Sequence, residues 1–172
     1  MSAPVELVRR TVPNLEISLR ETGKGRDKRH FGLAIYTPGE IIVNGKRKTI
    51  HEYVLDPHEG CLVYVEDSRV TTNTQIAVSA KLIPHGHEAS NAALEDAVKQ
   101  QIHTAEKSYL ATDANYRNCF DFAVQLVKCL KAAGYVSGAD YAKLEDYWRA
   151  NHEKVRAKTA AHVKEDIRNR KG

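Results

Sequence analysis

The spacing of apolar residues changes once along this chain, and that change limits the folds open to it. Up to about residue 80, apolar and polar residues alternate as in a half-buried strand, most clearly over residues 15–20. After the turn-forming run at 84–87, apolar residues recur every three or four positions, as in an amphipathic helix. Strands followed by helices predict an α+β fold, with an antiparallel sheet packed against helices.

Several short segments of the first half have strand composition and are separated by turn residues. Asn44 and Gly45 both tolerate positive φ, so they predict a tight hairpin. Glu66, Asp67 and Ser68 predict a turn, and the basic stretch 23–29 predicts an exposed loop. The predicted strands cover residues 15–20, 30–36, 41–43, 48–55, 61–65 and 74–80.

The second half predicts three helices. The first covers residues 94–109, with Ser90 or Asn91 as its N-cap. The second begins near Asn118 and ends at Gly134, which predicts a C-cap. The third begins near residue 138, and its apolar face thins toward the C-terminus, so its last turns are expected to fray. The apolar stripe of the second helix is formed by Cys119, Phe122, Ala123, Leu126, Val127 and Leu130.

Composition limits the compartment and the partners. A chain of 172 residues, 42% of them hydrophobic, fits one domain covering residues 1–172. Three cysteines cannot all pair within the chain, and neither a signal peptide nor a membrane-spanning stretch is evident, so we expect a cytoplasmic protein without a transmembrane anchor. The net charge of +4 comes largely from the last twenty residues, where basic side chains more often solvate a helix than bind nucleic acid. We therefore expect no stable nucleic-acid partner.

Cys119 is the strongest candidate for a reactive group. It is the first residue of the apolar stripe, so its thiol should face the sheet near the unsatisfied N–H groups of the first helical turn. Such a position, with a neighbouring imidazolium, lowers a thiol pKa. The alternative is that Cys119 is a small core hydrophobe, as most cysteines on apolar helix faces are. Cys61 and Cys129 lack this placement and are interpreted as structural or incidental.

Histidines offer a base and a competing metal site. His30 and His51 lie in neighbouring predicted strands and could approach each other, giving a base and an orienting partner for the thiol. His85 and His87, together with His58 or His103, could instead bind zinc. A His-x-His pair in a Pro/Gly turn is more often a solvated loop, and no carboxylate or cysteine lies at a diagnostic interval. We therefore expect no metal and no cofactor.

Two short motifs, His30-Phe31-Gly32-Leu33-Ala34-Ile35-Tyr36 and Asn118-Cys119-Phe120-Asp121-Phe122, resemble those of circularly permuted papain-like (NlpC-like) thiol enzymes. The pattern is most similar to the lecithin retinol acyltransferase and phospholipase/acyltransferase family, in which the histidine strand precedes the cysteine helix. PPPDE-type isopeptidases share this order. The resemblance covers roughly residues 25–134 and leaves 138–172 as a polar helical extension in place of the family's hydrophobic anchor.

The resemblance implies a role for each site residue. Cys119 would be the nucleophile, His30 the base and His51 the third polar residue. The implied activity is that of a cysteine-dependent hydrolase or acyltransferase acting on an amide, ester or thioester of a small-molecule, lipid or peptide substrate. The alternatives are a peptidase, deisopeptidase or deamidase using the same residues, and a non-catalytic binding module; the oligomeric state stays open. Substrate binding is assigned to Tyr36, Tyr53, Asn118 and Phe122.

Overall fold

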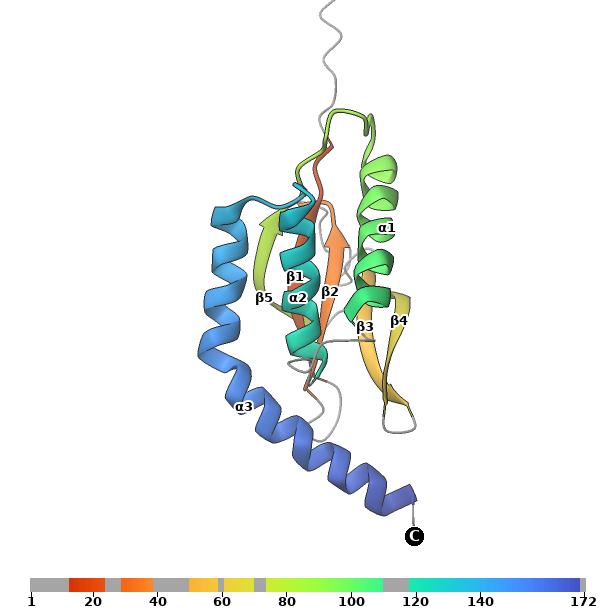
Figure 1. The fold of residues 1–172 in the computed structure, drawn as a ribbon, viewed down its shortest axis with the longest axis vertical. Coiled ribbons are helices and arrows are strands. Elements are labelled where there is room, and N and C mark those ends of the chain that lie inside the picture. The colour runs from red at the N-terminus through yellow and green to blue at the C-terminus, as the bar shows by residue number, and fades with distance from the viewer. Residues whose placement is uncertain are drawn as a thin grey trace, which may run out of the picture.

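The computed structural model describes residues 13–23, 29–38, 50–58, 61–69, 74–109 and 118–170. It contains an antiparallel sheet and three helices (Figure 1), so the prediction of an α+β fold is confirmed. The strands are β1 (Glu16–Gly23), β2 (Arg29–Tyr36), β3 (Ile50–His58), β4 (Cys61–Arg69) and β5 (Thr74–Lys81). The helices are α1 (Asn91–Tyr109), α2 (Cys119–Ala132) and α3 (Gly138–Arg170).

The five strands lie in the order β4-β3-β2-β1-β5, and every neighbouring pair is antiparallel. The first four therefore form a meander, while β5 joins the sheet beside β1. Helices α1 and α2 lie side by side over one face of the sheet. Helix α3 begins near the C-terminal end of α2, runs along β5 and then passes the N-terminal end of α2 (Figure 1). This arrangement brings the start of α2 close to β2.

Two sequence predictions for the strands have different outcomes. The turn predicted at Glu66, Asp67 and Ser68 is wrong, because these residues continue β4 and pair with β3. Pairing with a neighbouring strand overrides their turn preference. The predicted hairpin at Asn44 and Gly45, with strand 41–43 and most of the basic loop 23–29, lies outside the described residues.

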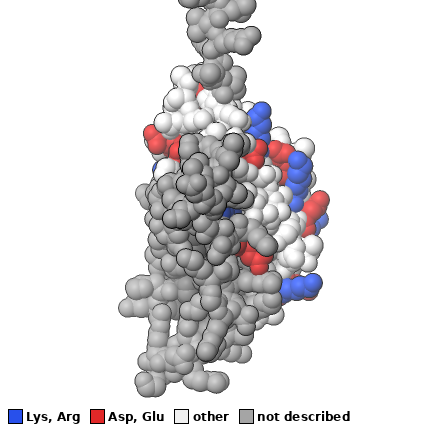
Figure 2. Space-filling model, turned by 180° about the vertical axis from the view of Figure 1, so that it is seen from behind, with Lys and Arg blue, Asp and Glu red and all other residues white. Residues whose placement is uncertain are grey.

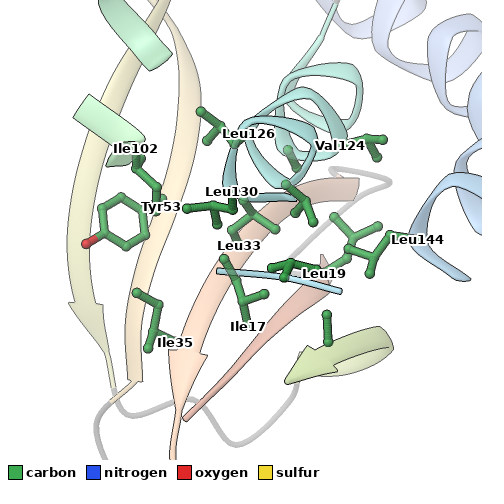
Figure 3. Packing of buried hydrophobic residues seen from close by; sticks show 14 of the residues in the cluster. Ile17, Leu19, Leu33, Ile35, Tyr53, Ile102, Val124, Leu126, Leu130 and Leu144 are labelled. Carbon is green, nitrogen blue, oxygen red and sulfur yellow. The ribbon is translucent and has the colours of Figure 1, made fainter. Parts of the chain in front are cut away.

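The core lies between α2 and the sheet (Figure 3). Side chains of β1 and β2, including Ile17, Leu19 and Leu33, pack beneath Leu126 and Leu130 of α2. Burying a side chain of this size stabilises the fold by about 1.5–3 kcal/mol relative to leaving it exposed. The opposite face of the sheet is also buried at its centre, where Ser18, Arg20, Ala34 and Glu52 are each at most 1% exposed. The core thus fixes α2 firmly against β2.

The end of α2 is a turn that requires glycine. Gly134 has φ of +86° and follows the C-cap residue Ala133, as predicted. The Tyr135 N–H donates to the Leu130 carbonyl at 2.9 Å and the Gly134 N–H to the Lys131 carbonyl at 3.0 Å, the two bonds of a Schellman motif. This turn directs the chain into α3.

Among its described side chains, up to residue 157, helix α3 buries one side and exposes the other. Tyr141, Leu144 and Val155 are buried, whereas Lys143 and Arg149 on the outer side pair with acidic residues of the same helix. On the face seen in Figure 2, basic and acidic side chains are interspersed over the described surface. The helix continues to Arg170, and the fraying of its last turns stays a prediction.

Candidate active site

Asn118 starts α2 and thereby sets the place of Cys119. Its backbone is extended, with φ of −159° and ψ of 178°, and its side-chain Oδ1 accepts a hydrogen bond from the Asp121 N–H at 2.9 Å. This is the N-cap arrangement, which satisfies one of the donors that a helix start leaves unpaired. Cys119 is therefore the first helical residue, as the sequence predicts.

The Cys119 thiol lies against β2. The Phe31 N–H donates to Sγ at 3.4 Å, and the Phe31 ring packs on the Phe120 ring with centroids 4.4 Å apart. The ladder between β2 and β3 begins only at Gly32, which pairs with Val54, while β3 and β4 stay paired as far as His58 and Cys61. The start of α2 therefore lies beside the part of β2 that is not paired with β3.

The environment of Cys119 raises its pKa, whereas the sequence analysis expected a lowered one. Burial is the largest cause and brings the pKa of the thiol to about 11, against an ordinary value of 9.0. The N–H groups of Phe31, Phe120 and Cys119 act in the opposite direction, and the negative charge of Asp121 raises the pKa further. Loss of hydration thus outweighs the helix N-terminus, because the side chain is only 6% exposed.

The backbone of His30 is close to the thiol. His30 pairs with Thr22 of β1 and directly precedes Phe31, the residue that donates to Sγ. Its imidazole lies outside the described part of the structure. Its role as base therefore stays a prediction.

His51 lies elsewhere. It opposes Ile35, five residues along β2 from His30, which corresponds to about 16 Å of strand. Its Nδ1 contacts the carboxylate of Glu95 of α1, which also pairs with Lys99. The expectation that the two histidines approach each other across neighbouring strands is wrong, because the sheet register separates them.

The four residues assigned to substrate binding are dispersed. Tyr53 and Phe122 are each 2% exposed and belong to the core, so their rings serve packing. Tyr36 lies at the far end of β2 and donates from its hydroxyl to Glu16 Oε2 at 2.6 Å. Only Asn118 is a neighbour of Cys119 in the chain.

Asn118 carries a buried polar group without a partner among the described residues. The residue is 1% exposed, and its Nδ2 has no hydrogen-bond partner among the described residues. Buried donors are nearly always paired in native proteins, so an unpaired one on the residue that precedes Cys119 is a candidate contact for a substrate oxygen.

Three residues that sequence analysis missed support the first turn of α2. Asp121 is 2% exposed and accepts from Trp148 Nε1 at 2.8 Å. It also accepts from Arg156 Nε at 3.1 Å and Nη2 at 3.2 Å. Arg156 therefore binds a buried carboxylate, in contrast to the expectation that it only solvates the C-terminal helix. An acidic residue between Phe120 and Phe122 was the available sequence signal.

Among the described residues, the histidines of the competing metal site form no metal-binding cluster. The His85 ring stacks on Tyr135, with centroids 4.0 Å apart, while its backbone N–H donates to Glu88. His103 lies on α1, and the side chain of His58 is outside the described part. Within the described ranges, no group of three or more His, Cys, Asp or Glu side chains is arranged to hold a metal ion.

Comparisons with known proteins leave the chain without an assigned relative. No protein-family model, curated protein or solved structure matches it. Among the described helices, none is both long enough and apolar enough to span a membrane. What the structure defines is an α+β protein with a buried cysteine at a helix start against an antiparallel sheet.

Proposed function

We propose that this protein is a cysteine-dependent hydrolase or acyltransferase with Cys119 as its nucleophile. The observation that supports the proposal most is the place of Sγ, at the first residue of α2 and on the N–H of Phe31, one residue after His30. A nucleophile and base pair needs a thiol and a histidine within contact distance, and the backbone next to His30 contacts Sγ.

The raised thiol pKa determines how the first step proceeds. Because burial raises the pKa of the Cys119 thiol to about 11, the thiol is predominantly protonated at pH 7. His30 must therefore take the proton as Sγ attacks the carbonyl carbon, because a preformed thiolate is too scarce. Since Cys119 is 6% exposed, the groups around it have to move to admit a substrate.

The remaining steps follow from acyl chemistry. The attack converts the carbonyl of an amide, ester or thioester into a tetrahedral oxyanion, which Asn118 Nδ2 and the Cys119 N–H can stabilise. His30 returns its proton to the leaving group, and an acyl thioester forms on Cys119. Water or an amine then attacks the thioester with His30 as base, which releases the product and regenerates the thiol. A peptidase, deisopeptidase or deamidase would use the same steps.

The proposal is tested by turnover. We expect purified protein to cleave or transfer at least one member of a panel of acyl-ester, peptide and isopeptide substrates. Cys119→Ala should abolish that activity, while Cys61→Ser and Cys129→Ser should retain it as matched controls. Activity that survives in Cys119→Ala but is lost in either control would refute the assignment of the nucleophile.

A second candidate function is a binding domain without turnover. The burial of Cys119 and its raised pKa favour it, because a buried thiol is usually a packing residue. On this account Cys119→Ala changes stability alone, and the panel yields no product with either protein.

A further inference from the structure

The start of α2 carries a second buried polar group besides the thiol. Asp121 lies two residues after Cys119, and its two carboxylate oxygens accept three hydrogen bonds from Trp148 and Arg156 of α3. Arg156 approaches it with two nitrogens, the geometry of a strong charge-assisted pair. The pair joins residues 35 positions apart in the chain.

The Asp121 side chain does not serve the cap of its own helix. An acidic residue three positions after an N-cap often accepts a hydrogen bond from the N-cap backbone. Here the Asp121 N–H binds Asn118 Oδ1, while the Asp121 carboxylate binds α3. The first turn of α2 is thus held from two sides, and Cys119 is part of that turn.

The charge of Asp121 acts on the thiol. An anion in a buried site opposes the formation of a second anion nearby, and Asp121 is among the groups that raise the pKa of Cys119. Among the described residues, the charged and titratable groups packed around this turn include Asp121, Arg156, His152, which stacks on Trp148, and Tyr147, whose ring contacts Phe120. Of these, Arg156 is the cation in direct contact with Asp121.

We propose that Arg156 is a positioning residue for Cys119: it neutralises Asp121 beside the thiol and holds the first turn of α2, so that α3 sets the reactivity of the nucleophile. The inference rests on the proposed role of Cys119. On this proposal, the long C-terminal helix α3 contributes to the reactivity of Cys119.

The test measures alkylation and needs no substrate, so its result is independent of whether a turnover assay succeeds. In a Cys61→Ser/Cys129→Ser background, the rates of Cys119 with neutral iodoacetamide and anionic iodoacetate are measured at fixed pH. The ratio of the two rates reports the local charge, because accessibility affects both reagents alike. Arg156→Gln should slow iodoacetamide about threefold, which corresponds to about half a pKa unit, and should slow iodoacetate more.

Matched variants distinguish an effect of charge on Cys119 from an effect of looser packing around the first turn of α2. Asp121→Asn should change both rates in the opposite direction, and the double variant should return close to the parent protein. Arg156→Lys should keep the rate ratio, and Trp148→Phe, which removes a hydrogen bond without a charge, should leave it unchanged. If Arg156→Gln does not fold, the test compares Asp121→Asn with the double variant. The alkylation rate of Cys119 should be lower in the double variant. Rates that rise in both single variants, or that do not change, overturn the proposal.

Discussion

Helices α2 and α3 begin with the same local arrangement in different surroundings. Asn118 and Ser137 each accept a hydrogen bond from the N–H of the aspartate three residues later, at 2.9 Å and 3.1 Å. Each aspartate then reaches another element: Asp121 binds α3, and Asp140 accepts from the backbone N–H of Lys81 in β5 at 3.0 Å. The two caps link α2 to α3 and α3 to the sheet.

The aspartates at the two helix starts differ in how deeply they are buried. Asp121 is 2% exposed, whereas the Asp140 side chain is 22% exposed and also contacts the exposed Lys143. A buried charge pair is costly to break because the surviving partner keeps the cost of desolvation, while a surface pair contributes little. Removing the aspartate should therefore destabilise the protein more at Asp121 than at Asp140.

The largest effect is expected at Asp121. Asp121→Ala leaves the Arg156 guanidinium and the Trp148 N–H without their acceptor, and should lower the free energy of unfolding by about 2–4 kcal/mol. Asp140→Ala is the matched control, with an expected loss of about 0.5–1 kcal/mol. Urea unfolding of both variants measures the difference, and equal losses would refute the role given to burial.

The losses of stability on removing the two N-cap side chains should differ less. Asn118→Ala should destabilise the protein by about 1–2 kcal/mol, and Ser137→Ala by about 0.5–1 kcal/mol, because both remove an N-cap but only Asn118 is buried. The same unfolding curves provide the values. A larger loss for Ser137→Ala would reverse the comparison.

The smallest effect concerns the charge of Asp140. The Lys81 N–H, together with Lys143, holds the pKa of Asp140 below its ordinary value of 3.8. A carboxyl whose pKa is lowered on folding stabilises the folded state above its unfolded pKa, and this contribution is lost as the pH falls through the folded pKa. The wild type should therefore be more stable than Asp140→Asn at pH 6, and the difference should disappear below the folded pKa. A difference that grows as the pH falls below 3.8 would contradict this sign.

These comparisons also show which structural features can be predicted from local sequence patterns. Asn118 as a cap and Gly134 as the C-terminal turn are predictable, because each depends on its own backbone conformation and a few neighbours. The continuation of β4 through Glu66–Ser68 is not, because pairing with β3 decides it. The contact of Asp121 with Arg156 joins distant segments and depends on how α3 crosses α2.

The candidate site is predictable in part for the same reason. The helix start predicts where Cys119 lies, but its pKa depends on burial, which the whole fold determines. The register of β2 and β3 places His51 opposite Ile35, and the packing of α1 supplies its partner Glu95. Neither fact follows from the residues around His51.

The most direct test of Cys119 as a nucleophile is to trap its acyl intermediate. Protein with Cys61→Ser and Cys129→Ser is mixed with an acyl thioester, quenched in acid and analysed by intact mass and peptide mapping. The account predicts one acyl group on Cys119, removed by hydroxylamine, absent in Cys119→Ala and formed at least about tenfold more slowly in His30→Ala. An unmodified Cys119, or acylation at the same rate in His30→Ala, would contradict it.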